Sequence, residues 1–184
     1  MIKKLLLKKK YVFISLKTKF LKKNQIASIC KLKNSVWPWS LPKQIKWFKK
    51  NVKENDINNM MILNNQIIGY TLLRKRKSYI NNKSLIYYYF DTFVVEKKYR
   101  KMGFGKALIL FNLKILRKLK KHSFLTCTTE HVSFYRKYNW KILPYAMFKI
   151  MDHKHFWFKN LSSVRGMTFN LKRKVNKKIL YYFN

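Results

Sequence analysis

The residues best placed to do chemistry form a basic, glycine-containing run, RKMGFGK, which begins at Arg100. Glycine is scarce, with four among 184 residues, yet Gly103 and Gly105 stand close together at the start of a predicted helix. Exposed backbone N–H groups at a helix N-terminus, little side-chain bulk and nearby cations together favour phosphate binding. Arg100, Lys101 and Lys106 supply the cations. The run therefore predicts an anion site suited to a diphosphate.

Other phosphate-binding motifs do not fit this run. It lacks the third glycine of a dinucleotide-binding loop and the Gly-Lys-Ser/Thr of a P-loop, and no strand–helix–strand repeat precedes it. The plain alternative is that Gly103 and Gly105 only turn the chain. Neither the four histidines nor the two cysteines, Cys30 and Cys127, show the spacing of a triad, an HExxH helix or a CxxC site. We therefore predict no metal.

A strand before the loop and a helix after it must position these residues. The segment 84–95 (SLIYYYFDTFVV) is the longest run of β-branched and aromatic residues, and apolar residues recur at helical spacing from Gly103 to Leu119. The other predicted elements are a strand at 11–16, helices at 20–33 and 43–52, strands at 60–63 and 66–73 with a turn at Asn64-Asn65, a strand at 124–128, a helix at 132–138, and strands at 140–150 and 165–171. The order β-α-α-β-β-β-α-β-α-β-β predicts an α+β fold in one domain, 1–172. The order of the basic tail, 173–184, stays open: it is a frayed terminus or an anchor.

Two motifs resemble the GNAT superfamily of N-acyltransferases. The stretch FVVEKKYRKMGFGKAL, from Phe93 to Leu108, is similar to its acyl-CoA-binding signature, in which a strand is followed by Arg/Gln-x-x-Gly-x-Gly/Ala and a helix. The later stretch SFYRKYNW resembles the FYxxxGF/W element of the family, with Asn139 standing where glycine is usual. Asn tolerates left-handed backbone angles, so the departure is mild. The resemblance implies a mixed, mostly antiparallel sheet flanked by helices, the α/β sandwich of that family.

The resemblance also implies a mechanism. An N-acetyltransferase of this type moves the acetyl group of acetyl-CoA, its co-substrate, to a primary amine by direct attack. The resemblance assigns the CoA contacts to Val94, Val95, Arg100, Lys101, Met102, Gly103, Phe104, Gly105 and Lys106, with the oxyanion donor at Val94 or Val95. Thr128 stands where many members carry Asn, so its cofactor contact is the weakest of the set.

Three side chains are candidate catalysts under the same resemblance. Tyr135 matches the tyrosine that protonates the departing thiolate, with packing of a helix on the sheet as the alternative. Asp91 matches an acid that acts as the base directly or through water, with an ion pair to a nearby Lys or Arg as the equally weighted alternative. Glu130 is a secondary candidate for the base.

The charge leaves other partners open. With 43 Lys and Arg against 6 Asp and Glu, the net charge of +37 attracts nucleic acid, anionic membranes and anionic cofactors alike. AT-rich codons would also explain the basicity, since Asn, Ile, Phe and Tyr are abundant too. The rival hypothesis is a nucleic-acid- or ribosome-associated binding protein on the same fold without turnover, and a membrane-surface role of the tail is a weaker one. Few cysteines and no apolar run of about 18 residues predict a cytoplasmic protein without a transmembrane segment. The sequence does not indicate the acceptor, the acyl chain length or the oligomeric state.

Overall fold

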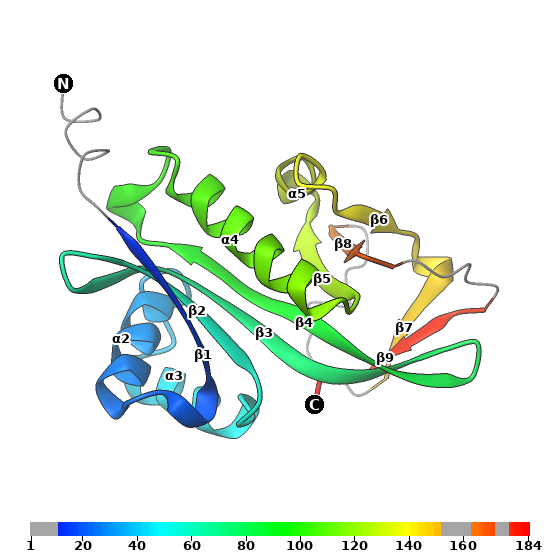
Figure 1. The fold of residues 1–184 in the computed structure, drawn as a ribbon, viewed down its shortest axis with the longest axis horizontal. Coiled ribbons are helices and arrows are strands. Elements are labelled where there is room, and N and C mark those ends of the chain that lie inside the picture. The colour runs from blue at the N-terminus through cyan, green and yellow to red at the C-terminus, as the bar shows by residue number, and fades with distance from the viewer. Residues whose placement is uncertain (1–10, 152–162, 172–176) are drawn as a thin grey trace. The chain divides into compact units, whose positions relative to one another are not determined.

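The computed structural model describes residues 11–151, 163–171 and 177–184 (Figure 1). These residues divide into two compact units. Unit 1 holds the described residues up to Leu73 together with Thr92–Leu113, and unit 2 holds Arg74–Asp91 and the described residues from Lys114 onward. Strands β3 (Gln66–Ile80) and β4 (Lys83–Val95) and helix α4 (Phe104–Leu119) each contribute residues to both units. The mixed, mostly antiparallel sheet flanked by helices confirms the predicted fold class.

In unit 1 the strands follow the order β1-β2-β3-β4, with β1 (Val12–Lys17) and β2 (Ile57–Leu63) paired antiparallel. Strand β2 also pairs antiparallel with β3 across a tight turn at Asn64-Asn65, where φ is 49° and 59°. Two successive left-handed residues match the twist of a two-residue hairpin. The predicted turn is therefore confirmed.

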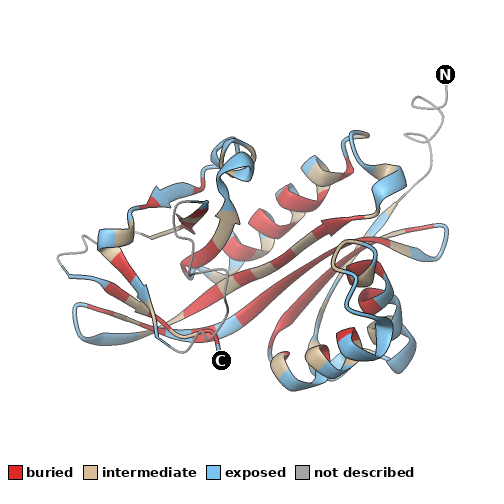
Figure 2. Ribbon diagram, turned by 180° about the vertical axis from the view of Figure 1, so that it is seen from behind, coloured by how far each residue is buried: buried red, intermediate tan, exposed pale blue. Residues whose placement is uncertain are grey.

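Helices cover both faces of the unit 1 strands. Helices α2 (Lys23–Asn34) and α3 (Leu41–Asn51) pack on a core cluster that includes Met60 of β2. The next residue, Met61, belongs instead to the cluster formed with the first turns of α4. Successive side chains of a strand point to opposite faces, so α2 and α3 lie against one face and α4 against the other. Strand β2 is consequently buried along almost its whole length (Figure 2).

In unit 2 the order is β3-β4-β5-β8-β6, with β4 and β5 parallel and β8 antiparallel to both of its neighbours. The remaining helix and strands of unit 2 are β5 (Ser123–Thr128), α5 (Val132–Arg136), β6 (Lys141–Leu143), β7 (Phe148–Ile150), β8 (Val164–Phe169) and β9 (Ile179–Tyr181). Short 3-10 turns in the described residues of both units are η1 (Thr18–Phe20), η2 (Lys97–Tyr99), η3 (Thr129–His131) and η4 (Tyr145–Met147). The core of unit 2 is largely aromatic, with Phe124 stacked on Tyr181 at a centroid distance of 4.1 Å.

The clearest differences from the sequence expectations concern three elements. The segment predicted as one strand at 140–150 is two short strands, because Pro144 lacks an N–H group and leads into η4. The helix predicted at 132–138 ends at Arg136. Strand β3 continues beyond Leu73 to a second hairpin turn at Asn81-Asn82, where φ is 49° and 64°. Residues 153–155 (HKH), which the sequence indicates as an exposed loop, lie outside the described residues.

The end of the chain is part of the core of unit 2. Strand β9 pairs with β3 and with β7, and Phe183 beyond it is buried. The Nε of Arg76, itself buried, donates a hydrogen bond of 2.9 Å to the Phe183 carbonyl oxygen, and the Phe183 ring stacks on Tyr89 at 3.9 Å. Residues 179–183, whose order the sequence left open, are therefore held by strand pairing, a buried guanidinium and ring stacking.

Candidate functional site

The loop between β4 and α4 is fixed to the end of the strand. The Arg100 Nε donates a hydrogen bond of 3.0 Å to the Val95 carbonyl oxygen. Lys101, at φ 61°, and Gly103, at φ 86°, both adopt left-handed backbone angles, which turn the chain sharply into the helix. For Lys101 that conformation costs about 1–2 kcal/mol relative to the right-handed one. The loop thus has a defined shape that includes one unfavourable backbone conformation.

The outer side of this loop is open. A Cβ atom built on Gly103 or Gly105 would meet nothing within 4 Å. The Ala107 N–H donates to the Gly103 carbonyl oxygen at 3.0 Å, so the N–H groups of residues 104–106 precede the first hydrogen bond of the helix. Open space above N–H groups without intrahelical partners is the geometry that accepts a phosphate. The residues present therefore fit a diphosphate.

The charge around the loop is strongly positive. The side chains of Lys97, Lys98, Arg100, Lys101 and Lys106 are all exposed. The one acid of this segment, Glu96, is half-buried and lies 3.3 Å from the Lys98 Nζ. Five cations against one carboxylate make an anion the favoured ligand.

The apolar members of the loop anchor it from below. Phe104 is 2% exposed and packs with Leu108 and Val95 in the cluster under the first turns of α4, while Met102 lies at the edge of that cluster. Val94 and Val95, one of which is the predicted oxyanion donor, are buried at the end of β4, and the Glu96 N–H next to them donates to the Ile68 carbonyl oxygen at 2.8 Å. The strand end and the loop are thus held by the same core.

The predicted catalytic groups Asp91, Tyr135 and Glu130 belong to unit 2, and the structure places each in a different environment. Asp91 is paired with a cation: its Oδ2 lies 2.8 Å from the Arg74 Nη1, with 15% of the Asp91 side chain and 6% of the Arg74 side chain exposed. Arg74 is the functional candidate that the sequence did not indicate, because only the register of the long β3–β4 hairpin brings together two residues 17 positions apart.

Tyr135 is buried on α5 among aromatic rings. Its ring makes edge contacts with Phe90 at 6.2 Å and Trp140 at 6.0 Å. Burial raises the pKa of the Tyr135 phenol well above its usual value, and nearby Cys127 and Tyr89 add to the effect. The phenol is therefore protonated at neutral pH, as an ordinary tyrosine also is.

Thr128 and Glu130 meet at the end of β5. The Thr128 hydroxyl donates to the Glu130 Oε1 at 3.0 Å and lies 2.8 Å from the His131 Nδ1. The Glu130 side chain is 73% exposed. This small exposed cluster holds the carboxylate in place but leaves it in contact with water. Water therefore screens the charge of the Glu130 carboxylate.

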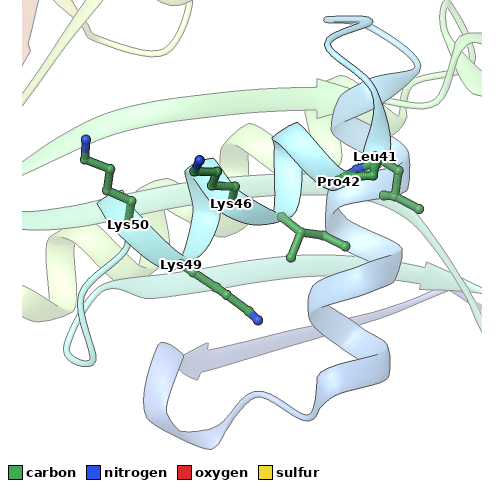
Figure 3. A pocket seen from close by; sticks show the side chains of 6 residues that line it. Leu41, Pro42, Lys46, Lys49 and Lys50 are labelled. Carbon is green, nitrogen blue, oxygen red and sulfur yellow. The ribbon is translucent and has the colours of Figure 1, made fainter.

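A hollow of about 730 Å³ lies along α3 and contains none of the predicted site residues. It is lined by three apolar and three basic side chains, those of Leu41, Pro42, Ile45, Lys46, Lys49 and Lys50. Figure 3 shows that the lysine side chains leave the helix in different directions. Ligand sites are built from convergent polar groups, so this hollow offers no catalytic arrangement.

The described residues offer neither a cluster of metal ligands nor a membrane-spanning helix. No group of three or more His, Cys, Asp and Glu side chains among them could hold a metal ion. Among the helices that the structure describes, none has the length and hydropathy needed to cross a membrane.

The loop and the second motif both lie within a region that matches a known family. The sequence profile of the acetyltransferase (GNAT) family matches residues 25–140, which include the loop and Tyr135. The protein therefore belongs to the GNAT family of acetyltransferases. No curated protein sequence matches the chain.

Several solved structures share the fold at low identity. Escherichia coli ElaA is 12% identical with a TM-score of 0.64, covering 86% of this chain and 99% of its own. The E. coli GNAT family N-acetyltransferase YhbS, solved in complex with CoA, is 12% identical with a TM-score of 0.63, covering 94% and 90%. The E. coli ribosomal-protein-S18-alanine N-acetyltransferase is 12% identical with a TM-score of 0.59, covering 90% and 97%. At this identity the likeness establishes the fold.

Proposed function

We propose that the protein is an N-acetyltransferase that moves the acetyl group of acetyl-CoA to a primary amine by direct attack. The observation that carries this proposal is the loop at 100–106, which has open space above Gly103 and Gly105, helix N–H groups without intrahelical partners and a surround of five exposed cations. These residues would hold the CoA diphosphate. The family membership and the CoA complex of YhbS support the same cofactor.

The chemistry requires no covalent enzyme intermediate. The acceptor nitrogen forms a bond to the thioester carbonyl carbon, and the bond from that carbon to sulfur then breaks. A backbone N–H at Val94 or Val95 would stabilise the oxyanion that forms between these events, since a fixed dipole needs little reorganisation. Tyr135, which is protonated at neutral pH, would give its proton to the departing thiolate sulfur.

The base that accepts the amine proton is assigned to Asp91. Its carboxylate is fixed by Arg74 and is mostly shielded from water, whereas Glu130 is largely exposed. A fixed position matters because proton transfer needs the base within hydrogen-bond reach of the acceptor nitrogen or of one water. The ion pair also leaves the second hypothesis in place, in which Asp91 serves the structure alone.

The acceptor class follows from charge. A protein with a net charge of +37 should repel polycationic amines and attract an amine that is anionic or carried on an anionic body. The fold likeness to the ribosomal-protein-S18-alanine N-acetyltransferase adds the amino group of a ribosomal protein to the acceptors worth testing. Both cysteines are free thiols, consistent with work in a reducing cytoplasm.

An acceptor panel with thiol detection tests the proposal. Released CoA would be measured with wild type, Tyr135→Phe and Asp91→Asn over acidic amines, peptides with an N-terminal alanine, and polyamines. We expect acyl transfer with the acidic or peptide acceptors and slower turnover in both variants. If polyamines proved the best acceptors, the charge argument would be wrong. If no acceptor were acylated although acetyl-CoA bound, the rival hypothesis of a basic binding protein without turnover would be favoured.

A further inference from the structure

A cluster of polar side chains is buried in unit 1 between α4 and two strands of the sheet. The Asn112 Oδ1 on α4 accepts hydrogen bonds from the Asn59 Nδ2 on β2 at 2.7 Å and from the Thr71 hydroxyl on β3 at 2.6 Å. The Asn112 Nδ2 donates to the Leu108 carbonyl oxygen one turn earlier at 2.8 Å. Asn59, Thr71 and Asn112 are each 0% exposed. The helix is thus tied to two strands through one amide.

This cluster is not well suited to stabilising the fold. Among the described residues, the buried Asn59 Oδ1 has no hydrogen-bond partner. A buried acceptor without a partner is unfavourable, and apolar side chains of similar shape in its place are often neutral or stabilising. What a polar cluster supplies better than an apolar one is a single geometry, because hydrogen bonds weaken steeply when the partners are displaced.

The geometry that it fixes is that of the helix carrying the loop. Phe104, Leu108 and Asn112 follow one another at helical spacing on one buried face of α4. Gly69 of β3 allows a close approach there, since a Cβ atom on it would lie 3.3 Å from the Leu108 Cδ2. At 1.5 Å per residue, Asn112 stands about 10 Å along the axis from Gly105. Any sliding or rotation of α4 would be carried directly to its first turn.

We propose that Asn112, acting with Asn59 and Thr71, is a positioning residue for the acyl-CoA site. The cluster sets the axial and rotational position of α4 on the unit 1 strands, and so aims the N–H groups of residues 104–106 at the bound diphosphate. Phe104 and Leu108 alone could pack at more than one register, because apolar contacts are not directional. This inference rests on the proposed function, in which the loop binds CoA.

The test exchanges the whole cluster for apolar residues of similar size in the triple variant Asn59→Leu, Thr71→Val and Asn112→Leu. We expect its resistance to urea unfolding to be equal to or higher than that of wild type. Its affinity for CoA, measured by calorimetry, should nevertheless fall at least about tenfold, since a misdirected charge-assisted hydrogen bond has roughly that effect. A merely structural role predicts instead that affinity follows stability.

Two controls separate position from stability. Thr71→Ser keeps the hydroxyl and should bind CoA as wild type does. Leu72→Ala opens a cavity in the core on the opposite face of the strands, and should lower stability without changing CoA affinity while the protein remains folded. Should the triple variant not fold cooperatively, Thr71→Val replaces it and should bind CoA more weakly than Thr71→Ser.

A second readout needs no CoA. Amide hydrogen exchange in the segment 103–107 of the ligand-free protein should change in the triple variant and stay unchanged in Leu72→Ala. Unaltered CoA affinity and unaltered exchange in the triple variant would overturn the positioning role and leave the proposed function standing. Wild-type protein that failed to bind CoA at all would overturn both.

Discussion

Acid should weaken unit 2 through His122. This side chain is 8% exposed just before β5, stacks on Tyr87 at a centroid distance of 5.6 Å and places its Nε2 3.5 Å from the Ser78 Oγ. Burial lowers the pKa of His122 from 6.5 to about 4. The imidazole is therefore neutral in the folded protein over a range of pH in which the unfolded chain binds a proton.

The sign and size of the effect follow from linkage. A depressed folded pKa means that the stability is fully present above about pH 6.5 and is lost as the pH falls toward 4. Each unit of pKa difference corresponds to about 1.4 kcal/mol, so the complete loss is about 3 kcal/mol and most of it occurs by about pH 4.5. That is a large fraction of the stability of an ordinary domain.

The loss of stability with falling pH can be measured by urea unfolding at about pH 7, 6, 5 and 4.5. Tryptophan fluorescence, to which the buried Trp140 contributes, would follow the unfolding. His122→Gln keeps a hydrogen-bonding nitrogen but cannot titrate, so its unfolding free energy should fall by about 2–3 kcal/mol less than that of wild type across this range. His131→Gln, at an exposed position, serves as the matched control and should behave as wild type does. Identical pH profiles for wild type and His122→Gln would refute the assignment.

Three other predictions rest on single positions. Gly103→Ala should destabilise the protein by about 1–2 kcal/mol in urea unfolding, because Gly103 has a φ of 86°. Gly105→Ala should be neutral or stabilising, because Gly105 lies within the helix and has open space around it. Equal effects of the two substitutions would contradict the loop geometry. Gly166→Ala should destabilise by about 1–3 kcal/mol, since its Cβ would lie 2.6 Å from the ring of Phe148, and an unchanged midpoint would show that the ring moves freely. Tyr135→Phe should lower kcat by roughly 10²-fold with little change in KM. Because its raised pKa keeps the phenol protonated, the wild-type rate should not fall between about pH 8 and 10 through ionisation of Tyr135. A Tyr135→Phe variant as fast as wild type would exclude the acid role.

Local signals in the sequence were sufficient for the framework. The Asn64-Asn65 turn, the long run that became β4 and the helical spacing after Gly103 were all correctly predicted, because each rests on backbone preference or on one period of apolar residues. The two motifs also led to the right family. The loop was found because glycine is rare in this chain and stood out against a lysine-rich background.

Features that depend on pairing between distant segments were missed. The predicted strand ended at residue 73, before the run RKRKS, yet β3 continues through this run. Arg74 and Arg76 are buried on one side of the strand, while Lys75 and Lys77 are exposed. Their partners are Asp91 and the Phe183 carbonyl oxygen, which only strand register brings close. The burial of such cations cannot be predicted from the local sequence pattern, because it depends on a partner that is distant in the sequence.

The central claim, that the loop at 100–106 holds acyl-CoA, is tested most directly by calorimetric titration of nucleic-acid-free protein with acetyl-CoA. The comparison is with the double variant Gly103→Asp and Gly105→Asp. A Cβ at either position meets nothing within 4 Å, so the variant should still fold, with a loss of about 1–2 kcal/mol because Gly103 has a φ of 86°. Free CoA and ATP would show how much binding is general attraction of anions. The account predicts saturable one-to-one binding, tighter than that of ATP and abolished in the variant. Acetyl-CoA that bound no better than ATP, or equally well to the variant, would contradict it.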